Sequence, residues 1–279
     1  MKTKSFRFQG IHLAYYDSES DLPPLLFCHA NGYSAGCYRY YHERLKDKYR
    51  IIALDFAGHG KSESTLDFKN WNFFRDQILT LLDHEKIESV TSVGHSLGGA
   101  STLLASAKEP ERFKKLIVWD PVVLGWKMIT LSKIFGNPLA RGAAKRRKTF
   151  RSMELIRRSY RKFPAFAKFD EGIFEDYISS CFKKAENGEE WELCCDPKVE
   201  SRIFGHSHYL VFLDFYKITK ETHVLIPEEY EVCGPKQAAL ITGKNEKSSV
   251  TVWSGITHFF PFEEPQSSLD WLNGKLEAP

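Results

Sequence analysis

The chain has 279 residues, of which 42% are hydrophobic, 14% aromatic and 27% charged. This composition is typical of a folded globular protein and excludes disorder as the global state. The formal net charge is only +3, and no stretch approaches the roughly 18 uncharged apolar residues of a membrane-spanning helix or carries the apolar segment of a secretory signal. We therefore expect no stable membrane insertion.

Short apolar segments alternate with helix-like segments along the chain. Residues 6–8 and 11–16 predict an opening hairpin. Buried strands are predicted at residues 25–28, 51–54, 90–93, 116–119, 224–226 and 250–253, and helices at residues 37–46, 71–84, 97–108, 236–241 and 266–276. This alternation predicts an α/β fold in which helices flank both faces of a mostly parallel sheet.

A long insertion interrupts the alternation. About a hundred residues separate the strand that ends at Trp119 from the strand that begins near Val224, whereas a crossover between parallel strands needs only about a dozen. Residues 154–161 and 173–184 have helical spacing. We therefore predict a core formed by residues 1–121 and 218–279, and an inserted helical cap formed by residues 122–217.

Charge is unevenly distributed within the predicted cap. Residues 127–168 contain thirteen Lys and Arg residues and one acid, whereas residues 169–200 contain ten acids and three Lys residues. A basic block followed by an acidic block can neutralise itself within one folded unit, so we expect no nucleic-acid partner. Two interpretations of residues 127–168 stay open: a solvated, partly self-paired helix surface, or a mouth that attracts anionic substrates.

The six cysteines predict no disulfide framework and no metal site. They lie at positions 28, 37, 181, 194, 195 and 233. No Cys-x-x-Cys pair is present, and the vicinal pair at 194 and 195 does not bridge easily. Reduced thiols in a cytoplasmic protein are therefore expected, and no cysteine or carboxylate stands at ligand spacing to the short histidine pair His206 and His208.

The most informative segment is residues 89–108. A β-rich apolar stretch leads into Gly94-His95-Ser96-Leu97-Gly98, and a segment of helical propensity follows at once. A Gly-x-Ser-x-Gly between a strand and a helix is typical of a nucleophile elbow, in which a sharp turn exposes the serine hydroxyl. The helix N-terminus places positive potential where an oxyanion would form. Ser96 is therefore the predicted nucleophile.

A serine hydroxyl is a poor nucleophile until a base takes its proton. His258 follows the predicted strand at residues 250–253 and precedes the last helix. The loop after a parallel strand lies at the same edge of the sheet as the elbow, which makes His258 the predicted base. His95, next to the serine, and His59, in a glycine-rich loop, are interpreted as structural.

The acid that orients the base has two candidates. Asp120 directly follows the strand at residues 116–119, and Pro121 ends that strand. Glu231 follows the strand beyond the predicted cap. Both positions satisfy the chain order serine, acid, histidine. We prefer Asp120 because a well-formed strand fixes its position, and Glu231 stays as the alternative.

A tetrahedral intermediate also needs backbone N–H donors. Leu97, the residue after the nucleophile, is expected to supply one donor. The loop after the strand at residues 25–28 is expected to supply the second, from Asn31, with Gly32 as a substitute.

Five motifs together carry a resemblance to a known family. They are HANGYSAGCY at 29–38, LDFAGHGKSE at 54–63, GHSLGGA at 94–100, WDPVV at 119–123 and SGITHFFPFEEP at 254–265. The combination resembles the α/β-hydrolase superfamily. The resemblance implies an eight-stranded sheet, a Ser-acid-His triad and a cap over the site.

The motifs predict a serine hydrolase that cleaves a carboxylic ester or a related small acyl compound. Ser96 would attack the carbonyl, His258 would carry the proton, and the N–H groups of Leu97 and Asn31 would receive the negative charge. This chemistry needs no metal and no organic cofactor. A lyase or a C–C bond hydrolase with the same triad is the alternative, and a non-catalytic protein that retains the fold is a third interpretation.

Overall fold

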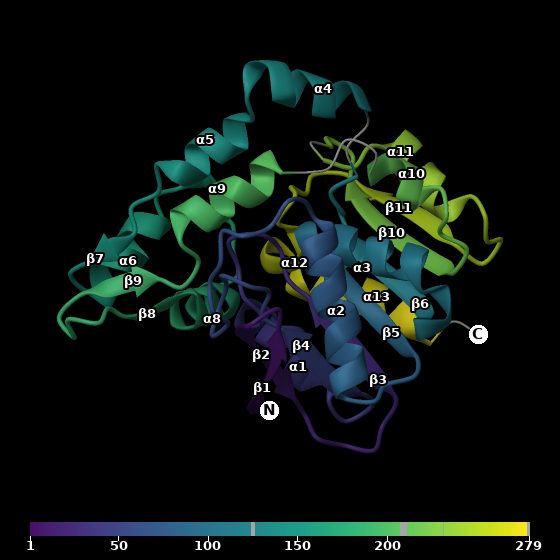
Figure 1. Cartoon of the computed structure of the whole chain (residues 1–279), viewed down its shortest axis with the longest axis horizontal. Helices are drawn as coiled ribbons and strands as arrows, with labels where there is room; N and C mark the ends of the chain where they lie inside the picture. The colour runs from purple at the N-terminus through teal and green to yellow at the C-terminus, as the bar shows by residue number, and fades with distance from the viewer. Residues whose placement is uncertain (124–125, 207–210, 231, 278–279) are drawn as a thin grey trace.

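The computed structural model describes residues 1–123, 126–206, 211–230 and 232–277. Eight strands form one sheet in the order β1-β2-β4-β3-β5-β6-β10-β11. Their bounds are β1 (Lys2–Phe8), β2 (Ile11–Asp17), β3 (Pro24–Cys28), β4 (Arg50–Leu54), β5 (Val90–His95), β6 (Phe113–Trp119), β10 (Glu221–Pro227) and β11 (Ser249–Trp253). β2 pairs antiparallel with β1 and with β4, and the other neighbours are parallel. The predicted eight-stranded, mostly parallel α/β sheet is confirmed (Figure 1).

Helices cover both faces of the sheet. The core helical segments are η1 (Ala35–Tyr38), α1 (Arg39–Leu45), α2 (Asn72–His84), α3 (Leu97–Lys108), η2 (Pro110–Arg112), α11 (Pro235–Thr242), α12 (Phe260–Glu263) and α13 (Pro265–Leu276). Successive side chains of a strand point to opposite faces. In β4, Ile52 and Leu54 pack in the cluster with α2, α3 and α11, whereas Ile51 and Ala53 pack in the cluster with α1 and α13. This double burial explains why the strands read as continuous apolar segments.

We call the segment between β6 and β10 the insertion. Its elements are α4 (Trp126–Phe135), α5 (Pro138–Ala144), β7 (Thr149–Phe150), α6 (Met153–Tyr160), α7 (Pro164–Ala167), α8 (Glu171–Cys181), β8 (Phe182–Lys184), β9 (Trp191–Leu193), α9 (Pro197–Gly205) and α10 (Val211–Phe215). The elements α4 to α9 run along the top and left of Figure 1, whereas α10 lies on the right beside α11. The prediction of a helix that continues to residue 184 is wrong: α8 ends at Cys181 and the chain continues as a strand. β8 pairs with β9, which in turn pairs with β7, so the insertion contains a three-stranded sheet.

The basic and acidic parts of the insertion pair with each other. The ion pairs that join them are Arg146–Glu200, Lys148–Asp196, Lys148–Glu192, Arg157–Glu175 and Arg161–Glu171. Several of these pairs are exposed, and exposed pairs contribute little to stability because water and salt screen them. They do cancel charge locally, and they offset four of the thirteen cations of residues 127–168.

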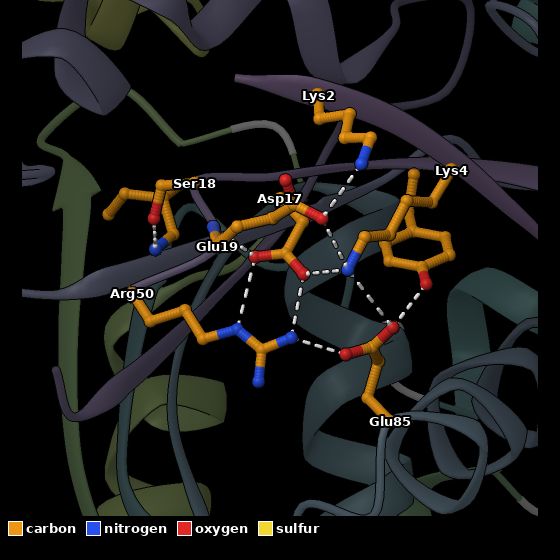
Figure 2. Close-up of polar contacts among 9 residues, drawn as sticks. Lys2, Lys4, Asp17, Ser18, Glu19, Arg50 and Glu85 are labelled. Carbon is orange, nitrogen blue, oxygen red and sulfur yellow. Dashed lines mark hydrogen bonds and ion pairs between the residues drawn. The ribbon is translucent and has the colours of Figure 1, made fainter. Parts of the chain in front are cut away.

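A network of charged side chains connects the β1–β2 hairpin to Arg50 of β4 and to Glu85 (Figure 2). Asp17, at the end of β2, is fully buried and accepts hydrogen bonds from Lys4 at 2.8 Å and from Arg50 Nε and Nη2 at 3.0 and 2.6 Å. Arg50 also contacts Glu85, which follows α2. Burial raises the pKa of Asp17, but the hydrogen bonds from Arg50 and Lys4 outweigh burial and lower it to about 2. The folded chain therefore favours the ionised carboxylate.

The acid stability of the fold is expected to depend on Asp17. Because its pKa is lower in the folded state than the unfolded value of about 3.9, its stabilisation is complete above about pH 5 and is lost as the pH falls toward 2. We expect Asp17→Asn to lower the free energy of unfolding at pH 7 by about 1–2 kcal/mol. Urea titrations at pH 7, 5 and 3 measure the difference between wild type and variant. An unchanged difference from pH 7 to pH 3 would contradict this role.

Candidate active site

A strained turn presents Ser96. β5 ends at His95 and α3 begins at Leu97, which leaves Ser96 between them with φ 55° and ψ −114°. A positive φ at a non-glycine residue costs on the order of 1–3 kcal/mol and persists only where the surroundings enforce it. The Ser96 N–H donates to the Trp119 carbonyl at 3.0 Å, and its own carbonyl accepts from Ala100 at 3.0 Å. The strand, turn and helix predicted around Ser96 are all present.

The turn needs glycine on both sides. A Cβ placed on Gly98 would lie 2.1 Å from the carbonyl oxygen of Cys28, in the neighbouring strand β3. A Cβ on Gly94 would lie 2.8 Å from the backbone of Gly98. No side chain fits at such distances, so the first turn of α3 can approach β3 and β5 only because both positions lack a Cβ.

Asp120 and His258 meet at the same edge of the sheet. Asp120 directly follows β6, is fully buried, and donates its backbone N–H to the Leu225 carbonyl of β10 at 2.8 Å. His258 lies between β11 and α12. Its Nδ1 lies 2.6 Å from Asp120 Oδ2. An ionised carboxylate can only accept, so Nδ1 carries the hydrogen in this contact, and the neutral ring keeps Nε2 available as a base.

One cavity of about 1140 Å³ collects the predicted site residues. Ser96, Leu97, Asn31 and His258 all line it. The alternative acid, Glu231, lies outside the residues that the structure describes. Three separate segments of the chain therefore converge on one cavity, and Asp120, from a fourth segment, contacts His258.

The backbone N–H groups of Leu97 and Gly32 differ in whether the fold already gives them an acceptor. Leu97 is the first residue of α3, and the first four N–H groups of a helix have no acceptor within it. Gly32 instead donates its N–H to His59 Nε2 at 3.1 Å. Burial lowers the pKa of His59 to about 4, so the ring is neutral near pH 7 and can accept. The Gly32 N–H is therefore already engaged within the fold.

A buried chain of hydrogen bonds, which the sequence analysis did not predict, connects the loops of the site. Tyr38 Oη accepts from the Ala30 N–H at 3.2 Å and lies 2.8 Å from His95 Nδ1. His95 Nε2 lies 3.0 Å from the carbonyl oxygen of His258. Burial lowers the pKa of His95 well below its ordinary value, so the neutral ring accepts from Tyr38 at Nδ1 and donates to His258 from Nε2. The expected structural role of His95 thus includes holding the His258 loop.

The same cavity also holds a group of polar side chains from the insertion. Arg146, Tyr160, Tyr177 and Glu200 line it together with Ser96 and His258. The Asn31 side chain donates to the backbone carbonyl of Glu200 at 3.1 Å. No local sequence pattern distinguishes Arg146 from the twelve other cations of residues 127–168. Among the residues that the structure describes, no cluster of three or more His, Cys, Asp and Glu side chains could hold a metal ion.

Comparison with known sequences agrees with the α/β fold described above. A family model described as the alpha/beta hydrolase fold matches residues 23–156. The uncharacterized hydrolase YugF of Bacillus subtilis (strain 168) is 31% identical over 117 residues, which are 41% of this chain and 43% of that protein. 3-Oxoadipate enol-lactonase 2 of Acinetobacter baylyi is 30% identical over 100 residues, which are 36% of this chain and 38% of that protein. The chain aligns with less than half the length of these curated relatives.

Solved structures extend the similarity to the whole chain. The crystal structure of E-2-(acetamidomethylene)succinate hydrolase superposes with a TM-score of 0.81 at 18% identity and covers 99% of both chains. At this identity the likeness concerns the fold. In the part of the chain that is described, no helix has both the length and the hydrophobicity needed to cross a bilayer.

Proposed function

We propose that this chain, which has the α/β-hydrolase fold, is a member of the α/β-hydrolase superfamily and a serine hydrolase that cleaves a carboxylic ester or a related acyl compound. One observation carries this proposal. Ser96, on a strained turn, lines the same cavity as His258, whose Nδ1 lies 2.6 Å from the buried carboxylate of Asp120. A hydroxyl, a base and an acid in this order suit nucleophilic acyl transfer.

The proposed reaction proceeds through an acyl-enzyme. The Ser96 hydroxyl attacks the carbonyl carbon while Nε2 of His258 takes its proton, and Asp120 stabilises the imidazolium that forms. The backbone N–H groups of Leu97 and Asn31 donate to the developing oxyanion. His258 then gives the proton to the leaving alcohol, and a water molecule activated by the same imidazole hydrolyses the acyl-enzyme. No step requires a metal or an organic cofactor.

The proposed substrate is a small-molecule acyl compound. The cavity of about 1140 Å³ is slightly larger than ordinary ligand pockets, which measure about 300–1,000 Å³, and its walls come from both the core and the insertion. We assign residues 1–121 and 218–279 to a catalytic core and residues 122–217 to a cap that shapes this pocket. An anionic substrate and a cytoplasmic location are part of the proposal.

A panel of p-nitrophenyl esters and acyl thioesters, from acetate to laurate, tests the reaction class. We expect wild type to hydrolyse the shorter esters, because a bounded cavity limits acyl length, with a pre-steady-state burst of p-nitrophenol when substrate is in excess over enzyme and deacylation is the slower step. Turnover of a 1,5-diketone or of a cyclohexadiene carboxylic acid without any ester hydrolysis would favour the C–C hydrolase or lyase alternative. Absence of turnover on every substrate, together with no labelling by a fluorophosphonate probe, would contradict the serine hydrolase proposal.

A further inference from the structure

Arg146 is a member of the basic segment whose guanidinium is turned into the catalytic cavity. It follows α5, and its Nη2 donates to Tyr160 Oη and to Tyr177 Oη, both at 3.0 Å. Its Nη1 forms an ion pair with the Glu200 carboxylate. The partners come from α6, α8 and α9, so three elements of the insertion hold one guanidinium in place.

This cluster contacts the loop that carries the proposed oxyanion donor. A Cβ placed on Gly32 would lie 3.2 Å from Arg146 Nη1 and 2.7 Å from Glu200 Oε1. Gly32 is the neighbour of Asn31, and consecutive Cα atoms are about 3.8 Å apart. A ligand group bound to Arg146 would therefore lie only a few bonds from a carbonyl held by the Asn31 N–H.

The cluster has more hydrogen-bond donors than acceptors. A guanidinium offers five N–H donors, and the contacts with Glu200, Tyr160 and Tyr177 use three of them. Burial raises the pKa of both tyrosines, so their hydroxyls are protonated near pH 7. One phenol donates to the other. Among the described residues, the unused donors are then two guanidinium N–H groups and one phenol O–H.

Charge around the cavity favours the same kind of ligand. Among the described residues that line it, the cations are Lys145, Arg146 and Arg147, and the only acid is Glu200. The tyrosines take both N–H groups of Nη2 and Glu200 takes one of Nη1, so within the described part of the chain the unused donors are one N–H on Nη1 and the N–H on Nε, each able to make one charge-assisted hydrogen bond to an anionic oxygen. Glu200 and the two tyrosines fix the side chain and leave these two donors unused.

We propose that the acyl part of the substrate carries a carboxylate, which binds the free donors of Arg146 and the Tyr160–Tyr177 pair while Ser96 attacks a carbonyl a few bonds away. The substrate class is then a monoester, or a related acyl derivative, of a short dicarboxylic acid. This inference rests on the proposed function. Arg146 acts as a specificity-determining residue, and Glu200 positions it.

A pair of esters of equal chain length tests the inference. Mono-p-nitrophenyl succinate carries a terminal carboxylate, whereas p-nitrophenyl butyrate carries a methyl group at that place. We expect wild type to prefer the succinate ester in kcat/KM by at least tenfold, because a site built from polar donors rejects an analogue that leaves them unpaired. Arg146→Met is expected to bring the ratio close to one. Arg146→Lys should lose most of the preference too, since an ammonium has three donors and cannot keep the contacts with Glu200, Tyr160 and Tyr177 while donating to a ligand.

Arg147→Met is the matched control. Arg147 is adjacent in sequence and lines the same cavity, but its Nε donates to the Thr149 carbonyl at 2.7 Å and its guanidinium lies over the Phe150 ring. Its removal changes the cavity charge by the same amount without touching the donor cluster. The succinate preference should keep most of its size in this variant, because only a longer-range part of the cavity charge is lost while the donors of Arg146 stay in place. Equal loss in both variants, or no succinate preference in wild type, would overturn the inference.

A binding measurement separates this inference from the hydrolase proposal. Succinate is expected to raise the thermal midpoint of Ser96→Ala protein, which cannot turn over, and to have no such effect on the Ser96→Ala, Arg146→Met double variant. Succinate binding without turnover of any ester would contradict the hydrolase proposal alone. Ester turnover without succinate binding would contradict the carboxylate site alone. If Arg146→Met does not fold, Tyr160→Phe combined with Tyr177→Phe replaces it, with a reduced succinate preference expected and an unchanged one decisive against the site.

Discussion

Replacing Ser96 by alanine is expected to lower kcat for the preferred ester by about 10⁴- to 10⁶-fold. The alanine variant has no hydroxyl to form the acyl-enzyme, and only binding and the amide donors of Leu97 and Asn31 would continue to assist the attack of water. Steady-state kinetics with active-site titration measure the effect. Labelling by a fluorophosphonate probe, followed by intact mass spectrometry, should fall from one adduct per chain to none.

Ser101→Ala is the matched control for this variant. Ser101 is a fully buried serine in the following turn of the same helix α3, and in the described part of the chain its hydroxyl has no hydrogen-bond partner. Its loss should leave both kcat and labelling within a fewfold of wild type. Full labelling of Ser96→Ala, or ester turnover at the wild-type rate, would remove Ser96 from the mechanism.

Asp120→Asn is expected to lower kcat by about 10⁴-fold with a much smaller change in KM. The carboxylate accepts the proton of His258 Nδ1 at 2.6 Å, whereas an amide can present its NH₂ group there instead and favour the tautomer in which Nε2 carries the hydrogen. In that tautomer the imidazole has no lone pair facing Ser96. Kinetics on the succinate ester, with circular dichroism to verify folding, measure the effect.

Glu231→Gln serves as the comparison for the acid. If Asp120 is the acid, this variant should keep kcat within a fewfold of wild type. A large loss of kcat in Glu231→Gln, with little loss of kcat in Asp120→Asn, would assign the role of the acid to Glu231 instead. Comparable losses in both would indicate that neither carboxylate alone orients His258.

Most of the core fold could be predicted from the sequence because each central strand is buried on both faces. Such strands produce uninterrupted apolar segments, as at residues 51–54, that few other structures require. The three-stranded sheet of the insertion has no such signal. Residues 182–184 continue the helical spacing of α8, and their strand conformation depends on pairing with Trp191–Leu193 across a turn. Pairing between short segments leaves no trace in local periodicity.

The candidate site also contains both residues that the sequence could predict and residues that it could not. Ser96 could be found because the elbow is local: the strand, both glycines and the helix lie within residues 90–108. Arg146 could not be identified as a cavity residue, since its partners lie 14, 31 and 54 positions away and its neighbours in sequence are also basic. The hydrogen bond between Tyr38 and His95 likewise spans 57 positions of the sequence, and only the folded topology brings those two side chains together.

The hydrogen bond from the Asn31 side chain to the Glu200 carbonyl has a consequence for protein engineering. A chimera that exchanges residues 122–217 for the equivalent part of another enzyme would change the substrate pocket and would also leave this amide without its acceptor. Grafted modules would therefore impair the chemical step unless they bring a main-chain oxygen to the same place. Directed evolution of substrate range in this scaffold should treat Asn31 and the start of α9 as one mutational unit.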